Sequence, residues 1–203
     1  MQKFITLFLS VILVLFTFFY VINVYYWNDT EQPNAKSGLL DLSNVNFGGN
    51  QTVKLNGEWE FYPGVFIEPD SESLAFEAYR DQKQIIKVPG RWDNYITNEK
   101  PYGTYRLIIK VPPFNNFGVK AGMIGFASKM YVNGKEVGSS GNVTDRYSEF
   151  NNSGYNAFFN SDSNKLELVI HVSSFKVKTG GITRPIKFGP SENILFDRDL
   201  YKM

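Results

Sequence analysis

The sequence contains no cysteine and a single histidine. The absence of cysteine excludes disulfide bonds, thiolate metal sites, cysteine nucleophiles and the bacterial lipoprotein anchor, which is attached to a cysteine. Because His171 is the sole histidine, no group of imidazoles can bind a transition metal, and a serine nucleophile would have no choice of base. Without disulfide bonds, the folded part must be stabilised by its core alone.

The sequence also lacks an excess of charge of either sign. Lysine and arginine number 21 against 20 aspartate and glutamate residues, which gives a formal net charge of +1. This balance does not point to a polyanion, so we expect no nucleic acid partner. Gly180 and Gly181 lack the flanking residues of a phosphate-binding loop, and we expect no cofactor.

The N-terminal region is apolar. Residues 4–27 carry no charge, and a helix of that length would cross a hydrocarbon core of roughly 30 Å. Bulky residues end this stretch where a signal peptide would have small ones, so we predict an uncleaved anchor over residues 1–27, with a cleaved signal segment as the alternative. Lys3 precedes the stretch while Asp29 and Glu31 follow it. The positive-inside rule therefore predicts a cytoplasmic N-terminus and an extracellular remainder.

Beyond the apolar region we expect a spacer and one folded domain. Residues 28–37 are polar, contain a proline and show no apolar period, which is typical of a linker. Residues 38–203 suffice for one well-buried domain. Because the sequence ends at Met203 without a second apolar span, we expect either the N-terminal part of a longer receptor or a free-standing anchored module.

Short segments of this domain alternate between apolar and polar residues. The alternation over residues 55–62 predicts a strand with Trp59 facing the core, and residues 105–111 and 166–172 predict two more. Proline, glycine and asparagine punctuate these segments, a pattern typical of a sandwich or barrel. The sequence therefore predicts an all-β fold.

Two connections carry local signals. Asn133 and Gly134 lie between two apolar runs and predict a tight type I′ hairpin, because both residue types tolerate a positive φ. Residues 71–84 have a weak helical period that fits either a short helix or a loop.

Eight short motifs follow one another along the domain, and their order is more specific than any one of them. They occupy residues 55–62, 88–92, 102–106, 131–135, 138–141, 172–175, 180–182 and 186–189. The first five resemble the sugar-binding jelly-roll domain of family 2 glycoside hydrolases. The last three resemble the extracellular domain of bacterial seven-transmembrane receptors with diverse intracellular signalling modules. The resemblance implies a galactose-binding-like jelly-roll β-sandwich used as an extracellular sensor. The apolar N-terminal stretch adds one transmembrane helix before it.

We expect no enzymatic activity. A glycosidase needs two carboxylates that flank the scissile bond, and Glu58 and Glu60 share one strand face that we expect to be exposed to solvent. Family 2 hydrolases carry their catalytic acids on a separate barrel, which this sequence lacks. His171 shares the outward face of its strand with Glu167, which predicts a structural or solvent-facing role.

We expect a ligand site on the loop before the strand at residues 105–111, because sandwich folds bind ligands on loops held by rigid strands. Aromatic rings there can stack on sugar C–H groups, while charged and amide groups bind hydroxyls. Trp92 and Tyr102 have core packing as their alternative role, and Arg106 either pairs with a carboxylate across the sheet or faces the ligand. The predicted ligand-binding residues are Arg91, Trp92, Asp93, Asn94, Tyr102 and Arg106.

The sequence therefore predicts a single-pass protein of the cell membrane that binds a carbohydrate or other small ligand, as a sensor or accessory module. The alternative is a module that contacts a partner membrane protein or an envelope polymer and has no small-molecule site. A concave surface with an aromatic ring and converging polar groups would favour the first function, and a flat apolar patch the second.

Overall fold

The computed structural model describes residues 9–20, 32–70, 74–97, 99–145, 153–175 and 180–199. The chain divides into two units, Met1–Gln32 and Pro33–Met203. In the first unit, residues 9–20 form a helix whose side chains are all exposed. Among the described residues, no helix is both long and apolar enough to cross a membrane. The rest of the predicted anchor, at residues 1–8 and 21–27, lies outside the described part of the chain.

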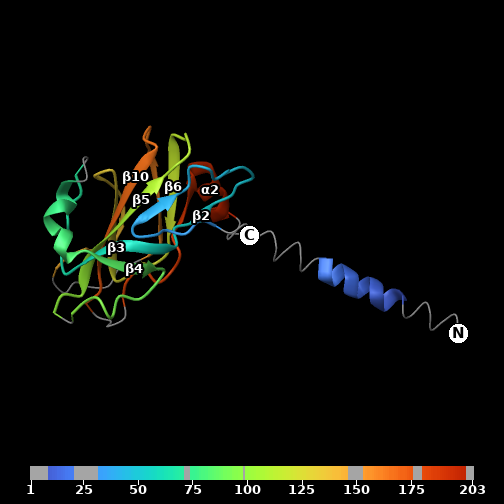
Figure 1. Ribbon diagram of the computed structural model, residues 1–203, viewed down its shortest axis with the longest axis horizontal. Coiled ribbons are helices and arrows are strands. Elements are labelled where there is room, and N and C mark those ends of the chain that lie inside the picture. The colour runs from blue at the N-terminus through green and yellow to red at the C-terminus, as the bar shows by residue number, and fades with distance from the viewer. Residues whose placement is uncertain are drawn as a thin grey trace. The chain divides into compact units, whose positions relative to one another are not determined.

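The second unit is a sandwich of two mostly antiparallel sheets (Figure 1). The larger sheet comprises β1 (Leu39–Asp41), β3 (Gly57–Pro63), β4 (Gln84–Val88), β5 (Tyr102–Lys110), β7 (Ala127–Val132), β8 (Lys135–Ser140) and β10 (Lys165–Ser173). The smaller sheet comprises β2 (Val53–Lys54), β6 (Asn116–Ala121), β9 (Tyr155–Asn160) and β11 (Lys187–Pro190).

In the larger sheet the strand order is β4-β3-β5-β10-β7-β8, and β1 pairs in parallel with the last residues of β5. In the smaller sheet it is β2-β11-β6-β9. These two packed sheets confirm the predicted all-β class. The narrower jelly-roll assignment stays a prediction.

The core lies between the sheets and contains the residues that alternation placed there. Trp59 is fully buried, and its indole Nε1 donates a hydrogen bond to the Leu55 carbonyl oxygen at 3.1 Å. Leu107 in β5 and Leu168 in β10 are also buried, at opposed positions of the two paired strands. The predicted faces of all three strands are confirmed.

The predicted hairpin is confirmed between β7 and β8. Asn133 and Gly134 have φ values of 47° and 77°, as a turn with two left-handed residues requires.

The chain joins the fold at Ala35, inside the predicted linker of residues 28–37. The Ala35 amide donates a hydrogen bond to the Asn56 carbonyl oxygen at 2.7 Å, and its own carbonyl accepts one from the Glu58 amide at 2.8 Å. The close approach of Ala35 to this strand requires a glycine between Asn56 and Glu58. Gly57 has a φ of 120°, and a Cβ there would lie 2.3 Å from the Ala35 carbonyl oxygen. Residues 28–31 lie outside the described part of the chain.

Two helices cover the outer faces of the sandwich, one on each sheet (Figure 1). The 3₁₀ helix η1 (Leu74–Gln82) lies within the region where the sequence left a short helix or a loop open. Asp70 caps it by accepting hydrogen bonds from the amides of Leu74 and Ala75. Phe76 of η1 is buried with Tyr62 in a small apolar cluster on the outside of the larger sheet.

The second helix, α2 (Ser191–Asp199), covers the smaller sheet and was not predicted from the sequence. Asp197 ties it to β6 and β11, because its carboxylate lies 2.7 Å from the ammonium groups of both Lys120 and Lys187. Ile194 packs over Gly118 of β6, where a side chain would leave too little room.

Candidate functional site

Trp92 belongs to the core and is not available as a sugar platform. Its side chain has no exposed surface, and its ring packs against the rings of Phe61 and Tyr105, with centroids 5.9 and 6.2 Å away. The backbone helps to hold this position, because the Trp92 amide donates a hydrogen bond to the Gly180 carbonyl oxygen at 3.3 Å. The core alternative for Trp92 is therefore the correct one.

The other loop residues of the predicted site do not surround Trp92. Arg91 and Asp93 form an exposed ion pair with each other at 2.6 Å, and Asn94 is exposed beside them. Tyr102 is half-buried in a row of aromatic rings, with Phe66 at 4.8 Å and Phe175 at 6.2 Å between centroids.

Arg106 lies on the opposite face of the sheet from Trp92, because it follows Tyr105 in β5 and successive side chains alternate. Its guanidinium nitrogens lie 2.6 Å from a carboxylate oxygen of Glu167 and 3.0 Å from one of Glu60. The centroid of the Phe76 ring lies 4.3 Å from the guanidinium carbon. The sequence left two roles open for Arg106, and the structure shows that it pairs with carboxylates across the sheet. The six predicted residues therefore do not converge on one site.

The charges in this cluster stabilise one another. Burial by itself would lower the pKa of Arg106, but Glu167 and Glu60 outweigh burial and raise that pKa above its usual value. Arg106 therefore stays charged. Glu60 also accepts a hydrogen bond from the Tyr62 hydroxyl at 3.1 Å and lies 3.3 Å from the Lys83 ammonium.

His171 and Glu167 do share the outward strand face, but that face is covered rather than exposed. Their side chains are 2% and 4% exposed. The histidine Nε2 lies 2.8 Å from the Ile67 carbonyl oxygen, so the ring donates this hydrogen bond. Burial lowers the pKa of His171, which keeps the ring neutral near pH 7. His171 therefore binds the segment around Ile67 to the sheet. The sequence left a structural and a solvent-facing role open, and the structure shows the structural one.

A hollow that the sequence did not predict lies where three loops meet at the other end of the larger sheet. The loops follow β1, connect β5 to β6 and connect β9 to β10, and the hollow has a volume of about 530 Å³. We call it the Asp162 hollow. Polar residues line it on all three loops, namely Ser43, Asn115, Asp162 and Asn164, and Lys165 lines it from the start of β10.

An aromatic ring stands at the edge of this hollow. Phe114 is 42% exposed, so much of its ring surface remains open to solvent. It packs edge-on against Phe47, with centroids 6.5 Å apart and ring planes at 79°. Phe47 is buried, and its carbonyl oxygen accepts a hydrogen bond from the Asn193 amide at 2.9 Å. Phe114 is therefore exposed on one side and supported on the other.

Backbone hydrogen bonds hold the loops of the hollow together. The Val111 amide donates to the Asn164 carbonyl oxygen at 3.0 Å, and the Ser161 amide donates to the Asn115 carbonyl oxygen at 2.9 Å. The loops that carry Asn115, Asp162 and Asn164 therefore have a fixed relative position, which limits the entropy lost when a ligand binds.

Asp41 does not line the hollow but binds Ser43, which does. Hydrogen bonds from the Ser43 hydroxyl and amide lower the pKa of Asp41, and Lys110 at 3.5 Å lowers it further. Within the described ranges, no group of three or more histidine, aspartate or glutamate side chains is arranged to bind a metal ion. The hollow can thus offer hydrogen bonds, charge and an aromatic surface to a ligand.

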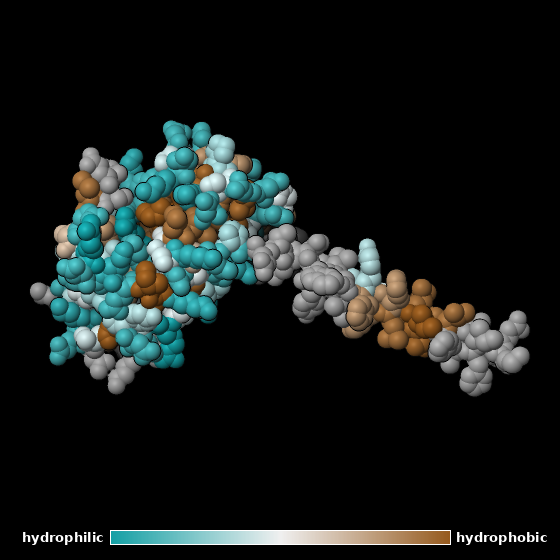
Figure 2. Space-filling view, viewed as in Figure 1, coloured by the Kyte–Doolittle hydropathy of each residue, from teal (hydrophilic) through white to brown (hydrophobic). Residues whose placement is uncertain are grey.

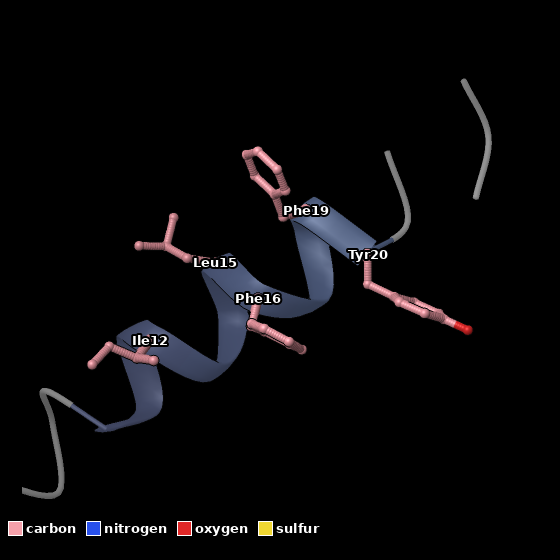
Figure 3. A pocket seen from close by; sticks show the side chains of 5 residues that line it. All are labelled: Ile12, Leu15, Phe16, Phe19 and Tyr20. Atoms are coloured by element: carbon pink, nitrogen blue, oxygen red, sulfur yellow. The ribbon is translucent and has the colours of Figure 1, made fainter. Parts of the chain in front are cut away.

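Another hollow is lined by the side chains of a single helix. Ile12, Leu15, Phe16, Phe19 and Tyr20 project from successive turns of the helix at residues 9–20 (Figure 3). Space of this kind lies between neighbouring side chains and is not enclosed by a fold. Figure 2 shows that the helix surface is hydrophobic, whereas the visible surface of the sandwich is mostly hydrophilic.

Comparisons with known proteins give no family assignment. No family model matches the sequence, and no curated protein matches it. Solved structures that resemble the fold include a beta-glucuronidase from an uncultured Clostridium species, with 16% identity and a TM-score of 0.47. This match covers 70% of the present chain and 29% of the enzyme.

Two more beta-glucuronidases show similar values. The Ruminococcus gnavus enzyme is 12% identical with a TM-score of 0.47, over 68% of this chain and 29% of that chain. A calcium-binding mutant of beta-glucuronidase 2 from Bacteroides uniformis is 22% identical with a TM-score of 0.49, over 68% and 18% respectively. The present chain thus matches less than a third of the length of each of these enzymes. The resemblance to receptor domains stays a prediction.

Proposed function

We propose that this protein is a carbohydrate-binding module, held at the outer side of the cell membrane by its N-terminal apolar segment. In this role it serves as a sensor or as an accessory protein that keeps a glycan close to the cell. The proposal rests on one observation: an exposed, supported Phe114 ring stands beside a hollow lined by amides, a carboxylate and an ammonium group.

A pyranose has the complementary surface. Its C–H face is apolar and stacks on an aromatic ring, while its hydroxyls both donate and accept hydrogen bonds. The Asn115 and Asn164 amides can do both, and the Asp162 carboxylate accepts from hydroxyl donors. A ligand with an apolar face and a polar edge therefore fits the Asp162 hollow better than a wholly apolar one.

The lining of the hollow favours binding over hydrolysis. Two carboxylates must flank a glycosidic bond for hydrolysis, and in the described part of the chain Asp162 is the one carboxylate that lines this hollow. The pair considered from the sequence is also unsuited, because the Glu60 carboxylate already lies 3.0 Å from Arg106.

The membrane part of the proposal rests on the N-terminal segment. Residues 4–27 carry no charge, and the apolar side chains of the helix at residues 9–20 are exposed. Exposed apolar surface of this kind is stable in contact with lipid and costly in water. The charges that flank the segment support a cytoplasmic N-terminus.

A protein-contact module is the second candidate. Phe158 on β9 and Phe196 on α2 are 42% and 47% exposed on the elements of the smaller sheet, and exposed aromatic residues are enriched where proteins bind one another. These residues do not line the Asp162 hollow. The two candidates therefore predict different sensitive residues.

The test compares two phenylalanines of equal exposure. Phe114→Ala and Phe158→Ala each remove a ring that is 42% exposed, but only Phe114 borders the hollow. Titration calorimetry of the full chain in nanodiscs against a glycan panel is expected to find a binder whose affinity falls at least about tenfold with Phe114→Ala. Phe158→Ala should leave it unchanged. Equal effects of the two variants, or no binding by the intact protein, would overturn the proposal.

A further inference from the structure

A second hollow adjoins the first across Phe114. It has a volume of about 310 Å³ and lies between the β5–β6 loop and the start of α2, and we call it the Leu195 hollow. Phe114 and Asn115 line both hollows. The two hollows therefore meet at an aromatic residue and an amide residue.

Both hollows are large enough for a small ligand, but the residues that line them differ in polarity. Each has a volume within the range of roughly 300–1,000 Å³ that suits a small ligand. The Asp162 hollow is rich in charge, whereas the Leu195 hollow combines the apolar Pro190 and Leu195 with the polar Ser191 and Glu192. Each hollow thus offers both apolar contact and hydrogen bonds.

We propose that this surface binds an oligosaccharide chain that lies across both hollows, with sugar units on either side of Phe114. This inference rests on the proposed carbohydrate-binding function. A compact ligand would fill one hollow and leave the other empty. A chain of sugars presents an apolar face and hydroxyls again at each unit, so successive units can use the shared ring and the polar groups on both sides of it.

The ring itself suits such a border. Phe47 supports Phe114 from within the fold at 6.5 Å, so the exposed ring is held at the junction of the hollows. Asn115 offers its amide at the same place, and its backbone carbonyl is already engaged with the Ser161 amide at 2.9 Å. An internal sugar unit would therefore meet one stacking surface and one bidentate hydrogen-bonding group on loops of fixed position.

The experiment measures affinity as a function of chain length. The probes are mono-, di-, tri- and tetrasaccharides of the glucose, xylose, mannose and N-acetylglucosamine series, titrated into the full chain in nanodiscs. We expect the tetrasaccharide of the bound series to bind at least about tenfold more tightly than the monosaccharide. Phe114→Ala should weaken binding at every length.

Two adjacent residues of α2 give a matched pair of variants. Leu195 lines the second hollow and Phe196 does not, although both are exposed. Leu195→Ser should reduce the tetrasaccharide affinity to that of the short sugars and leave monosaccharide binding unchanged, while Phe196→Ser should change neither. Circular dichroism checks that both variants fold.

The outcomes distinguish this inference from the proposed carbohydrate-binding function on which it rests. If sugars bind in a Phe114-dependent manner but affinity does not grow with length, the extended-chain inference is wrong and the carbohydrate-binding function stands. The same holds if Leu195→Ser weakens the monosaccharide as much as the tetrasaccharide. If no length of any series binds, both proposals are wrong.

Discussion

The indole ring of Trp92 stacks on the phenol ring of Tyr105, with centroids 6.2 Å apart and ring planes at 17°. Both side chains have no exposed surface. Gly180 also packs closely against the indole, since a Cβ there would lie 2.5 Å from the indole Nε1. A residue that the sequence suggested for sugar stacking is thus part of the packing between the sheets.

Trp92→Ala should accordingly destabilise the domain. Removing a fully buried tryptophan leaves a cavity, and we expect the free energy of unfolding to fall by about 3–5 kcal/mol in urea titrations. Arg91→Ala serves as the control, because its ion pair with Asp93 is exposed and should contribute less than about 1 kcal/mol. Near-native stability of the Trp92→Ala protein would contradict the packing seen here.

The sequence predicted strand faces well because burial in a sheet repeats every two residues. Trp59 and Leu168 followed directly from that alternation. It also placed His171 on the outward face correctly. It did not predict that η1 and the chain before it cover that face, because the covering segment contacts the sheet through isolated residues such as Ile67, which leave no periodic signal.

The candidate site was missed for a related reason. The expectation that ligands bind on loops named the loop around Trp92, but alternation does not continue into loops and so cannot separate a buried aromatic residue from an exposed one. The only sequence signal for the observed hollow is Phe114 itself, an aromatic residue directly after Pro112 and Pro113 and before two asparagines. Its exposure depends on tertiary contacts with Phe47.

Adjacent residues of β3 test the register of the core. Trp59 is fully buried and Glu58 is exposed. Trp59→Ala should lower the free energy of unfolding by about 3–5 kcal/mol, whereas Glu58→Ala should lower it by less than about 1 kcal/mol. Thermal and urea unfolding measure both. Equal small effects would show a register shifted by one residue, which exchanges the two faces.

His171 should make stability depend on pH in the mildly acidic range. Burial lowers its pKa in the folded state, while the unfolded chain keeps the ordinary value of 6.5. As the pH falls below about 6.5, the unfolded state takes up the proton first, so the free energy of unfolding should decrease until the folded pKa is passed. Urea titrations at a series of pH values measure this slope.

His171→Gln is the control for this pH effect. The glutamine amide can still donate to the Ile67 carbonyl oxygen but does not titrate, so the slope just below pH 6.5 should disappear. Asp41 and Asp197 act at lower pH, because hydrogen bonds and lysines lower their pKa values below the ordinary 3.8. An unchanged slope in the His171→Gln protein would exclude His171 as its source.

The N-terminal segment should keep the protein in the membrane fraction. We expect the full chain to resist extraction by alkaline carbonate, and protease added to intact cells should remove the domain. Replacing Leu13 by Lys and Phe16 by Asp within the helix at residues 9–20 should weaken retention, because each charge at the centre of a span costs roughly 2.5–3.5 kcal/mol. A soluble extracellular product that begins near residue 28 would instead identify a signal peptide.

Arg106 and Glu167 should behave as a coupled pair. Their side chains lie 2.6 Å apart and are 16% and 4% exposed, and the Phe76 ring centroid lies 4.3 Å from the guanidinium carbon of Arg106. Arg106→Met leaves the Glu167 carboxylate buried without its partner, so the free energy of unfolding should fall by about 3–5 kcal/mol. The double variant Arg106→Met with Glu167→Leu removes both charges and should recover much of that loss in urea titrations. If the two changes are simply additive, the pair is not the contact that stabilises this face. If Arg106→Met keeps full stability but abolishes glycan binding, Arg106 faces the ligand instead, which was the other role that its sequence position allowed.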